Sequence, residues 1–198
     1  MKTLDLISGG MMRYANRRYI LPLLFLLILI LIFMERGPFG SGAIKSLSGG
    51  EGTLDMTFGY SASQAHGLIT RIGNEGRQIY TKLLGLDFLF AAVYMALQSL
   101  LITALIKKAN LPTRFEKLNL LPFLRSALDV VENCLLLSLI ASFPTFKPAV
   151  AMIASAITVV KLVLNYLYIA VVFFLGALTS NRAIHMKKRD ASERGRVA

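Results

Sequence analysis

The chain has 198 residues, of which 55% are hydrophobic and only 17% are charged, and its mean hydropathy is +0.60. A soluble domain typically has about 25% charged residues. The apolar residues here are concentrated in a few long runs, which excludes a disordered chain, a coiled coil and a disulfide scaffold. The composition therefore predicts an integral membrane protein.

The net charge of +11 comes from 22 basic and 11 acidic residues. Such an excess can indicate a nucleic-acid partner, but no basic stripe with interleaved aromatic residues exists outside the apolar runs. Membrane proteins place Lys and Arg in cytoplasmic segments, where these residues meet anionic lipid head groups. We therefore expect the lipid bilayer as a partner and no nucleic acid.

Motifs for soluble chemistry are absent from the sequence. The single cysteine, Cys134, cannot form an internal disulfide or a CxxC pair. His66 and His185 lie outside the apolar runs, so no apolar run supplies a zinc site or a histidine base. Asp129 and Glu132 have a spacing that could hold a metal, but the histidines of a di-metal bundle are missing. We expect neither a metal nor a cofactor.

Four apolar runs approach or exceed the length of about 20 residues that crosses a bilayer. They cover approximately residues 19–35, 83–106, 120–142 and 149–178. The first follows a basic start, as a signal peptide does, but its length and the lack of a clear cleavage site predict an uncleaved anchor. The last is longer than crossing requires, which predicts that it is tilted or protrudes.

Residues 36–82 connect the first two predicted spans. Residues 37–57 are rich in Gly and Ser and have no periodicity, which predicts a loop. Ser61 or Ser63 can cap a short helix with apolar positions on one face, and a second helix should begin near Asn74. This pattern predicts an amphipathic helical hairpin on the membrane surface, and the alternative is a solvated loop.

The distribution of Lys and Arg predicts the topology. Fifteen of the 22 basic residues lie in the N-terminal tail, the connector at residues 107–125 and the C-terminal tail, which begins at residue 182. Cytoplasmic segments are enriched in Lys and Arg, so we expect both termini in the cytoplasm and residues 36–82 outside. The short tails, without a retention signal, indicate a bacterial plasma membrane. We predict an all-α fold with a single membrane domain over residues 1–198, built as a four-transmembrane-helix bundle with a short extracytoplasmic hairpin.

Three predicted spans carry polar residues along a single helical face. On the third span, Arg125, Asp129 and Glu132 follow the spacing i, i+4, i+7. The stripe on the fourth span consists of Thr158, Lys161, Asn165 and Tyr168. The stripe on the second span consists of Asp87, Tyr94 and Gln98. A charged group at membrane depth costs at least ~2.5 kcal/mol on insertion scales. We therefore expect the stripes to face one another rather than lipid.

The helical rise of about 1.5 Å per residue predicts the depth of these groups. It places Glu132 about 15 Å and Lys161 about 18 Å below the outer ends of their spans. We therefore expect an ion pair of Lys161 with Glu132 or Asp129 near the midplane. Asp87 should lie near the outer boundary, and Arg125 near the cytoplasmic boundary, where it can snorkel to water.

Two interpretations of this cluster remain open. In the structural one, Lys161 neutralises one carboxylate, while amide and tyrosine side chains satisfy the others and fix the helix register. In the functional one, one acid lacks a deep cationic partner and holds a proton, a cation or a ligand amine in a polar pocket open to the outer side. The candidate residues of the ligand or ion-pair cluster are Asp87, Tyr94, Arg125, Asp129, Glu132, Asn133, Lys161 and Asn165.

A dense polar run enters the second span and contains Arg77 and Tyr80. We expect both side chains to face lipid or to lie at the interface. Arg77 could pair with a lipid phosphate, Asp55 or Glu75, and the simpler alternative is a solvated arginine at a capped helix start.

The sequence predicts a non-enzymatic membrane protein that binds a partner protein, lipid or small amphiphile through its intramembrane polar cluster. The alternative is a transporter or proton-coupled carrier subunit that acts as an oligomer, because four helices rarely enclose a pathway alone. A membrane-embedded lipid-modifying enzyme is the third hypothesis. The expected partners are the lipid bilayer and another membrane protein or a second copy of this chain.

Overall fold

The computed structural model describes the backbone of residues 2–197 and the side chains of residues 4–181. The predicted basic residues of the C-terminal tail, with His185, therefore have side chains outside the described residues. The described chain is 84% helical and contains no strand, which confirms the all-α prediction. Its elements are α1 (Lys2–Tyr14), α2 (Arg17–Arg36), α3 (Ser41–Leu47), η1 (Leu54–Met56), α4 (Ala62–Arg71), α5 (Gly73–Lys108), η2 (Thr113–Leu120), α6 (Leu121–Ala141) and α7 (Pro148–Val197).

Three helical segments of the described chain are long and apolar enough to cross a membrane: Arg17–Leu47, Gly73–Lys108 and Pro148–Asn181. They contain the first, second and fourth predicted spans. The third predicted span is α6, which is 21 residues long. It is not among the three segments, and it carries three charged residues within its length.

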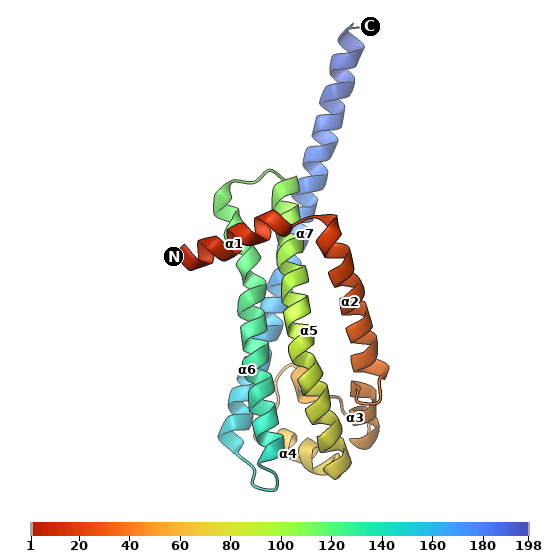
Figure 1. Cartoon of the computed structure of the whole chain (residues 1–198), viewed down its shortest axis with the longest axis vertical. Helices are drawn as coiled ribbons and strands as arrows, with labels where there is room; N and C mark the ends of the chain where they lie inside the picture. Colours follow the sequence, from red (N-terminus) through yellow and green to blue (C-terminus); the bar gives the residue numbers. More distant parts are fainter. Residues whose placement is uncertain (1, 198) are drawn as a thin grey trace.

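The long helices α2, α5, α6 and α7 run side by side along the long axis of the molecule (Figure 1). Helix α5 contacts α2, α6 and α7, and α6 also packs along α7. Helix α1 lies across one end of these helices, in contact with η2 and α5, and we refer to this as the α1 end. The short elements α3, η1 and α4 cover the opposite end, the α4 end, whereas α7 continues past the α1 end (Figure 1).

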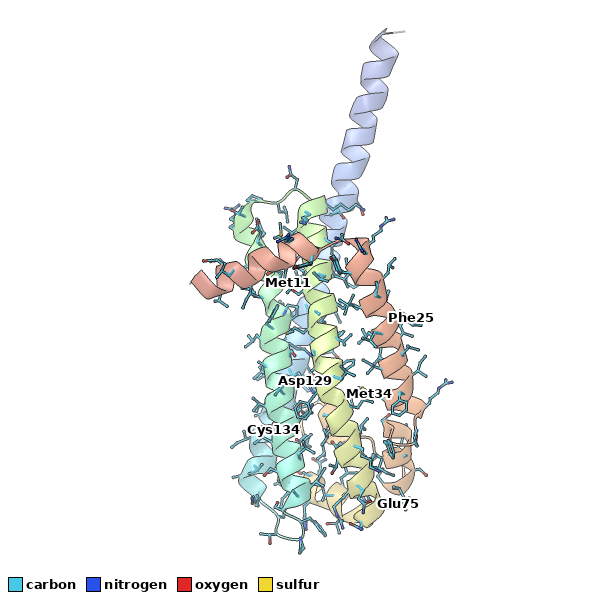
Figure 2. All side chains as sticks on the ribbon, in the orientation of Figure 1. Met11, Phe25, Met34, Glu75, Asp129 and Cys134 are labelled. Atoms are coloured by element: carbon cyan, nitrogen blue, oxygen red, sulfur yellow. The ribbon has the colours of Figure 1, made fainter. Side chains whose placement is uncertain are left out.

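The outer surface of the long helices is apolar. Helix α2 exposes most of its leucines, isoleucines and phenylalanines, and it buries only Leu27 and Ile30 among them. Figure 2 shows Phe25 on the outer side of α2 and Met34 on the side toward α5. Leu27 and Ile30 pack against Val93 and Leu97 of α5. A helix that is apolar on every side and yet exposed is suited to lipid rather than to water.

Helix α4 begins where the sequence predicts it. The Ser61 side chain accepts a hydrogen bond from the Gln64 N–H, and Gln64 Oε1 accepts one from the Ser61 N–H at 2.7 Å, which forms a capping box. The apolar face of α4 is buried through Ala65, Leu68 and Ile69. Helix α5 begins at Gly73, one residue before the predicted start.

The prediction of a loop over residues 37–57 is wrong in part, because α3 and η1 lie within it. Ile44 of α3 is completely buried and Leu54 of η1 nearly so, and both join the apolar core at the α4 end. Packing of these two side chains therefore orders a segment whose Gly and Ser content favours a loop. The sequence analysis also missed α1 and η2, which lie together at the α1 end.

Candidate functional site

Helix α6 buries its charged residues and exposes apolar residues beside them. Arg125, Asp129 and Glu132 are all buried, whereas Val130 and Val131 are exposed. The inward face lies against α5 and α7, the two helices that carry the other polar stripes. This arrangement is the reverse of a soluble helix, and it is how membrane proteins accommodate charged groups.

Lys161 of α7 joins two carboxylates of α6. Its Nζ lies 2.8 Å from Asp129 Oδ1 and also pairs with Glu132 Oε2. The second oxygen of Glu132 accepts a hydrogen bond from the Thr158 hydroxyl. Both forms of the predicted ion pair are therefore present, and its charged groups are at most 5% exposed.

Arg125 is a second buried cation of the cluster. Its Nη1 lies 3.0 Å from Asp129 Oδ2, one helical turn away on α6, and its guanidinium lies 4.9 Å from the centre of the Tyr94 ring. The expectation that Arg125 snorkels to the boundary is therefore wrong. The carboxylate and the aromatic face compensate the guanidinium inside the protein, so its side chain does not need to reach water.

Asp87 of α5 is the carboxylate of this cluster that lacks a cation among the described side chains. It is 6% exposed, and its Oδ2 accepts a hydrogen bond of 2.7 Å from Asn133 Nδ2. Tyr94 donates a hydrogen bond to Asn165 Oδ1 at 3.1 Å. The structure thus brings all eight predicted cluster residues together at the contacts between α5, α6 and α7, and Asp129 is labelled there in Figure 2.

Asp87 also lines a pocket of about 280 Å³ that the sequence analysis did not locate. The pocket lies between α2, α3, η1 and α5. Its apolar walls are Leu31, Met34, Met56, Leu83, Leu84 and Phe90. Its polar walls are Glu35, Ser41, Thr53, Asp55 and Asp87. These residues come from separate segments of the chain, so no spacing in the sequence reveals them.

The polar part of the pocket is acidic. Glu35 accepts a hydrogen bond from the Ser41 hydroxyl at 2.5 Å, and Asp55 accepts one from the Tyr80 hydroxyl at 2.8 Å. No lysine or arginine lines the pocket. Within the described part of the chain, no three Asp, Glu, His or Cys side chains converge as a metal site would require. The pocket therefore presents carboxylates beside a mainly apolar wall.

The prediction that Tyr80 faces lipid needs correction. Tyr80 is completely buried, so it does not face lipid. Its hydroxyl accepts a hydrogen bond from the Leu54 N–H at 3.0 Å and donates to Asp55, which anchors η1 to α5. Arg77 donates a hydrogen bond to the Ile69 carbonyl at 3.1 Å and lies over the Phe143 ring. The hydrogen bond satisfies a backbone carbonyl in the last turn of α4.

A further contact anchors the segment before α4. The Tyr60 N–H donates to Ser155 Oγ of α7 at 2.8 Å. Burial raises the pKa of the Tyr60 hydroxyl, so that hydroxyl stays neutral. Together with Tyr80, this contact ties the residues between α3 and α4 to the long helices, and it fixes the wall of the pocket that η1 supplies.

No protein-family model, curated protein or solved structure matches the chain. The chemistry of the site has two parts: a charge-compensated group of ion pairs inside α5, α6 and α7, and a mainly apolar pocket with acidic side chains. Asp87 belongs to both parts.

Proposed function

We propose that the protein spans the membrane four times, with α2, α5, α6 and α7 as the spans and α4 at the outer surface. The apolar exposed face of α6 supports its role as the third span, because Val130 and Val131 would meet lipid while its charges stay inside. The excess of Lys and Arg in the tails and in the connector at residues 107–125 supports cytoplasmic termini. The proposed location is a bacterial plasma membrane.

The proposed function is the binding of a small amphiphile in the pocket that Asp87 lines. One observation carries it: the two buried cations, Lys161 and Arg125, pair with Asp129 and Glu132, and Asp87 is left with an amide partner and an adjoining cavity. A buried carboxylate is stabilised by a cation close to it. The ligand would supply that charge, and its apolar body would occupy the apolar walls.

The order of residues along α2 and α5 supports an orientation for this ligand. Phe90 lies about 4.5 Å further along α5 than Asp87, toward the middle of the helix. Leu31 lies about 6 Å before Glu35 on α2, again toward the middle. The acidic residues are therefore nearer the α4 end, so the cationic head would point outward and the apolar body inward.

The ion pairs of Lys161 have a structural role in this proposal. They hold α6 and α7 in one register, because a shift of either helix would leave a buried charge without its partner. The bond from Asn133 to Asp87 extends this control to α5. The same bond supports the second candidate function, a carrier, because it links the ligand pocket to the ion-paired interior. A carrier would act as an oligomer.

The charge of the ligand can be tested with a matched pair of probes. Tetraphenylphosphonium and tetraphenylborate have nearly the same shape and opposite charges. Equilibrium dialysis of the detergent-purified protein should show saturable binding of the cation, and an excess of the borate analogue should not displace it from a site that Asp87→Asn weakens. No saturable binding of the cation, or binding that Asp87→Asn leaves unchanged, would contradict the proposed function. Uptake of the cation into proteoliposomes would establish the carrier, and binding without uptake would favour the simple binding protein.

A further inference from the structure

A second groove lies at the α1 end, away from the pocket of Asp87. It has a volume of about 350 Å³ and runs between α1, α2 and α5. Its walls are apolar along α2 and α5, where they consist of Pro22, Leu23, Ala96 and Leu100. Tyr14, Arg18 and Tyr19 line its entrance, and the lining surface is almost entirely apolar. The groove is therefore an apolar channel with the exposed Arg18 at its entrance.

The charge at this entrance is not neutralised within the described chain. No described carboxylate pairs with Arg18, whose backbone N–H donates to the Asn16 side chain. Arg17 and Arg18 occupy the first turn of α2, which contains no acidic residue. The positive end of a helix dipole favours anions and disfavours cations. Two arginines at this position leave positive charge uncompensated, and a bound anion would neutralise it.

The dimensions and position of the groove indicate which kind of molecule carries the anionic group. Leu23 lies about 7.5 Å along α2 from Arg18, so the apolar walls run from the mouth toward the middle of the helices. Tyr14 and Tyr19 pack edge to face with ring centres 5.4 Å apart, and tyrosines are typical of the boundary between lipid and water. An anion with a long apolar tail fits both features, whereas a free phosphate would leave the walls unoccupied.

We infer that this groove binds an anionic phospholipid, with its phosphate at Arg18 and an acyl chain along Leu23, Ala96 and Leu100. The positive surface at the α1 end complements the negative head group. The site is separate from the amphiphile pocket, and the inference does not depend on the proposed function. It assigns to Arg18 a specific contact beyond the general effect of basic residues on topology.

Native mass spectrometry tests this inference on the whole protein released from micelles that contain equal phosphatidylglycerol and phosphatidylcholine. We expect the wild type to retain phosphatidylglycerol about fivefold more than phosphatidylcholine, the effect of about one charged contact at a membrane surface. Arg18→Gln should remove this preference. Arg13→Gln should keep it, because Arg13 carries the same charge at the same end but does not line the groove.

A second pair of variants tests the apolar walls without changing charge. Ala96→Phe fills the groove and should lower phosphatidylglycerol retention, whereas Ala127→Phe, on an exposed face of α6 away from the groove, should not. Millimolar glycerol phosphate should not displace the lipid. Equal retention of both lipids by the wild type, equal losses in Arg13→Gln and Arg18→Gln, no effect of Ala96→Phe, or displacement by glycerol phosphate would each overturn the inference.

Discussion

Lys161 lies between two carboxylates of α6, and its charge decides whether those carboxylates are tolerated inside the protein. At the residue scale, the negative charges of Asp129 and Glu132 are matched by two cations, because Arg125 supplies a second positive charge beside Lys161. Replacing a buried ion pair as a unit is often harmless, whereas removing one partner strands the other. Single and paired substitutions should therefore have different effects.

We expect Lys161→Met to lower the free energy of unfolding by about 3–5 kcal/mol, because it leaves Glu132 without a cation. Thermal unfolding in detergent measures this effect. The double variant Lys161→Met/Glu132→Gln should be more stable than the single variant, since Arg125 still pairs with Asp129. A Lys161→Met protein as stable as the wild type would show that the ion pairs contribute nothing to the fold.

Tyr80 gives a second prediction at this scale. Tyr80→Phe removes a hydroxyl that bonds both to the buried Leu54 N–H and to Asp55, so we expect a loss of about 1–3 kcal/mol in stability. Tyr166→Phe is the matched control, because Tyr166 is exposed on α7. Chemical unfolding of the two variants in the same detergent compares them, and equal stability would remove the proposed anchor of η1.

At the scale of the element, α6 tests whether the exposed apolar faces meet lipid. Val131 lies near the middle of α6 and is 47% exposed. Val131→Asp should impair membrane insertion, at a cost of about 2.5–3.5 kcal/mol for a charge at the centre of a span. Thr81→Asp places the same group on an exposed position near the start of α5 and should insert normally.

Fractionation of cells into membrane and soluble parts measures the outcome for both variants. Efficient membrane insertion of Val131→Asp would mean that this face of α6 meets water or another protein segment, which would contradict the assignment of α6 as a span.

The elements differ in how far the sequence predicts them. The long helices α2, α5 and α7 follow from long apolar runs, and α4 follows from Ser61 and its apolar face, because both signals are local. Helix α1 has no such signal. Its position depends on Asn119 of η2, whose amide donates to the Ser8 carbonyl at 3.2 Å, a contact between residues far apart in the chain.

The candidate site divides in the same way. The polar stripes predicted which residues of α5, α6 and α7 would meet, because helical spacing fixes the face of each residue. The stripes could not predict the pocket of Asp87, since α2, α3 and η1 supply its other walls. The prediction that Tyr80 faces lipid was wrong for a related reason. The partners of its hydroxyl, Leu54 and Asp55, lie in a segment whose order depends on packing.

At the scale of the whole molecule, the proposed topology places α4 outside the cell and η2 inside it. A cysteine-free protein, made with Cys134→Ser, allows single cysteines to report each side. Ser63→Cys on α4 should react with a membrane-impermeant maleimide in intact cells. Glu116→Cys on η2 should react only after permeabilisation, and the opposite pattern would invert the topology.

The central claim is that Asp87 holds a cationic ligand at the edge of the ion-paired interior. Titration of tetraphenylphosphonium into purified Asp87→Asn protein tests it most directly, because an asparagine can still accept the bond from Asn133 while carrying no charge. We predict that the affinity falls about tenfold to a hundredfold relative to the wild type. The affinity of Glu75→Gln, an exposed position outside the pocket, should not change. A folded Asp87→Asn protein that binds the cation as tightly as the wild type would contradict the account.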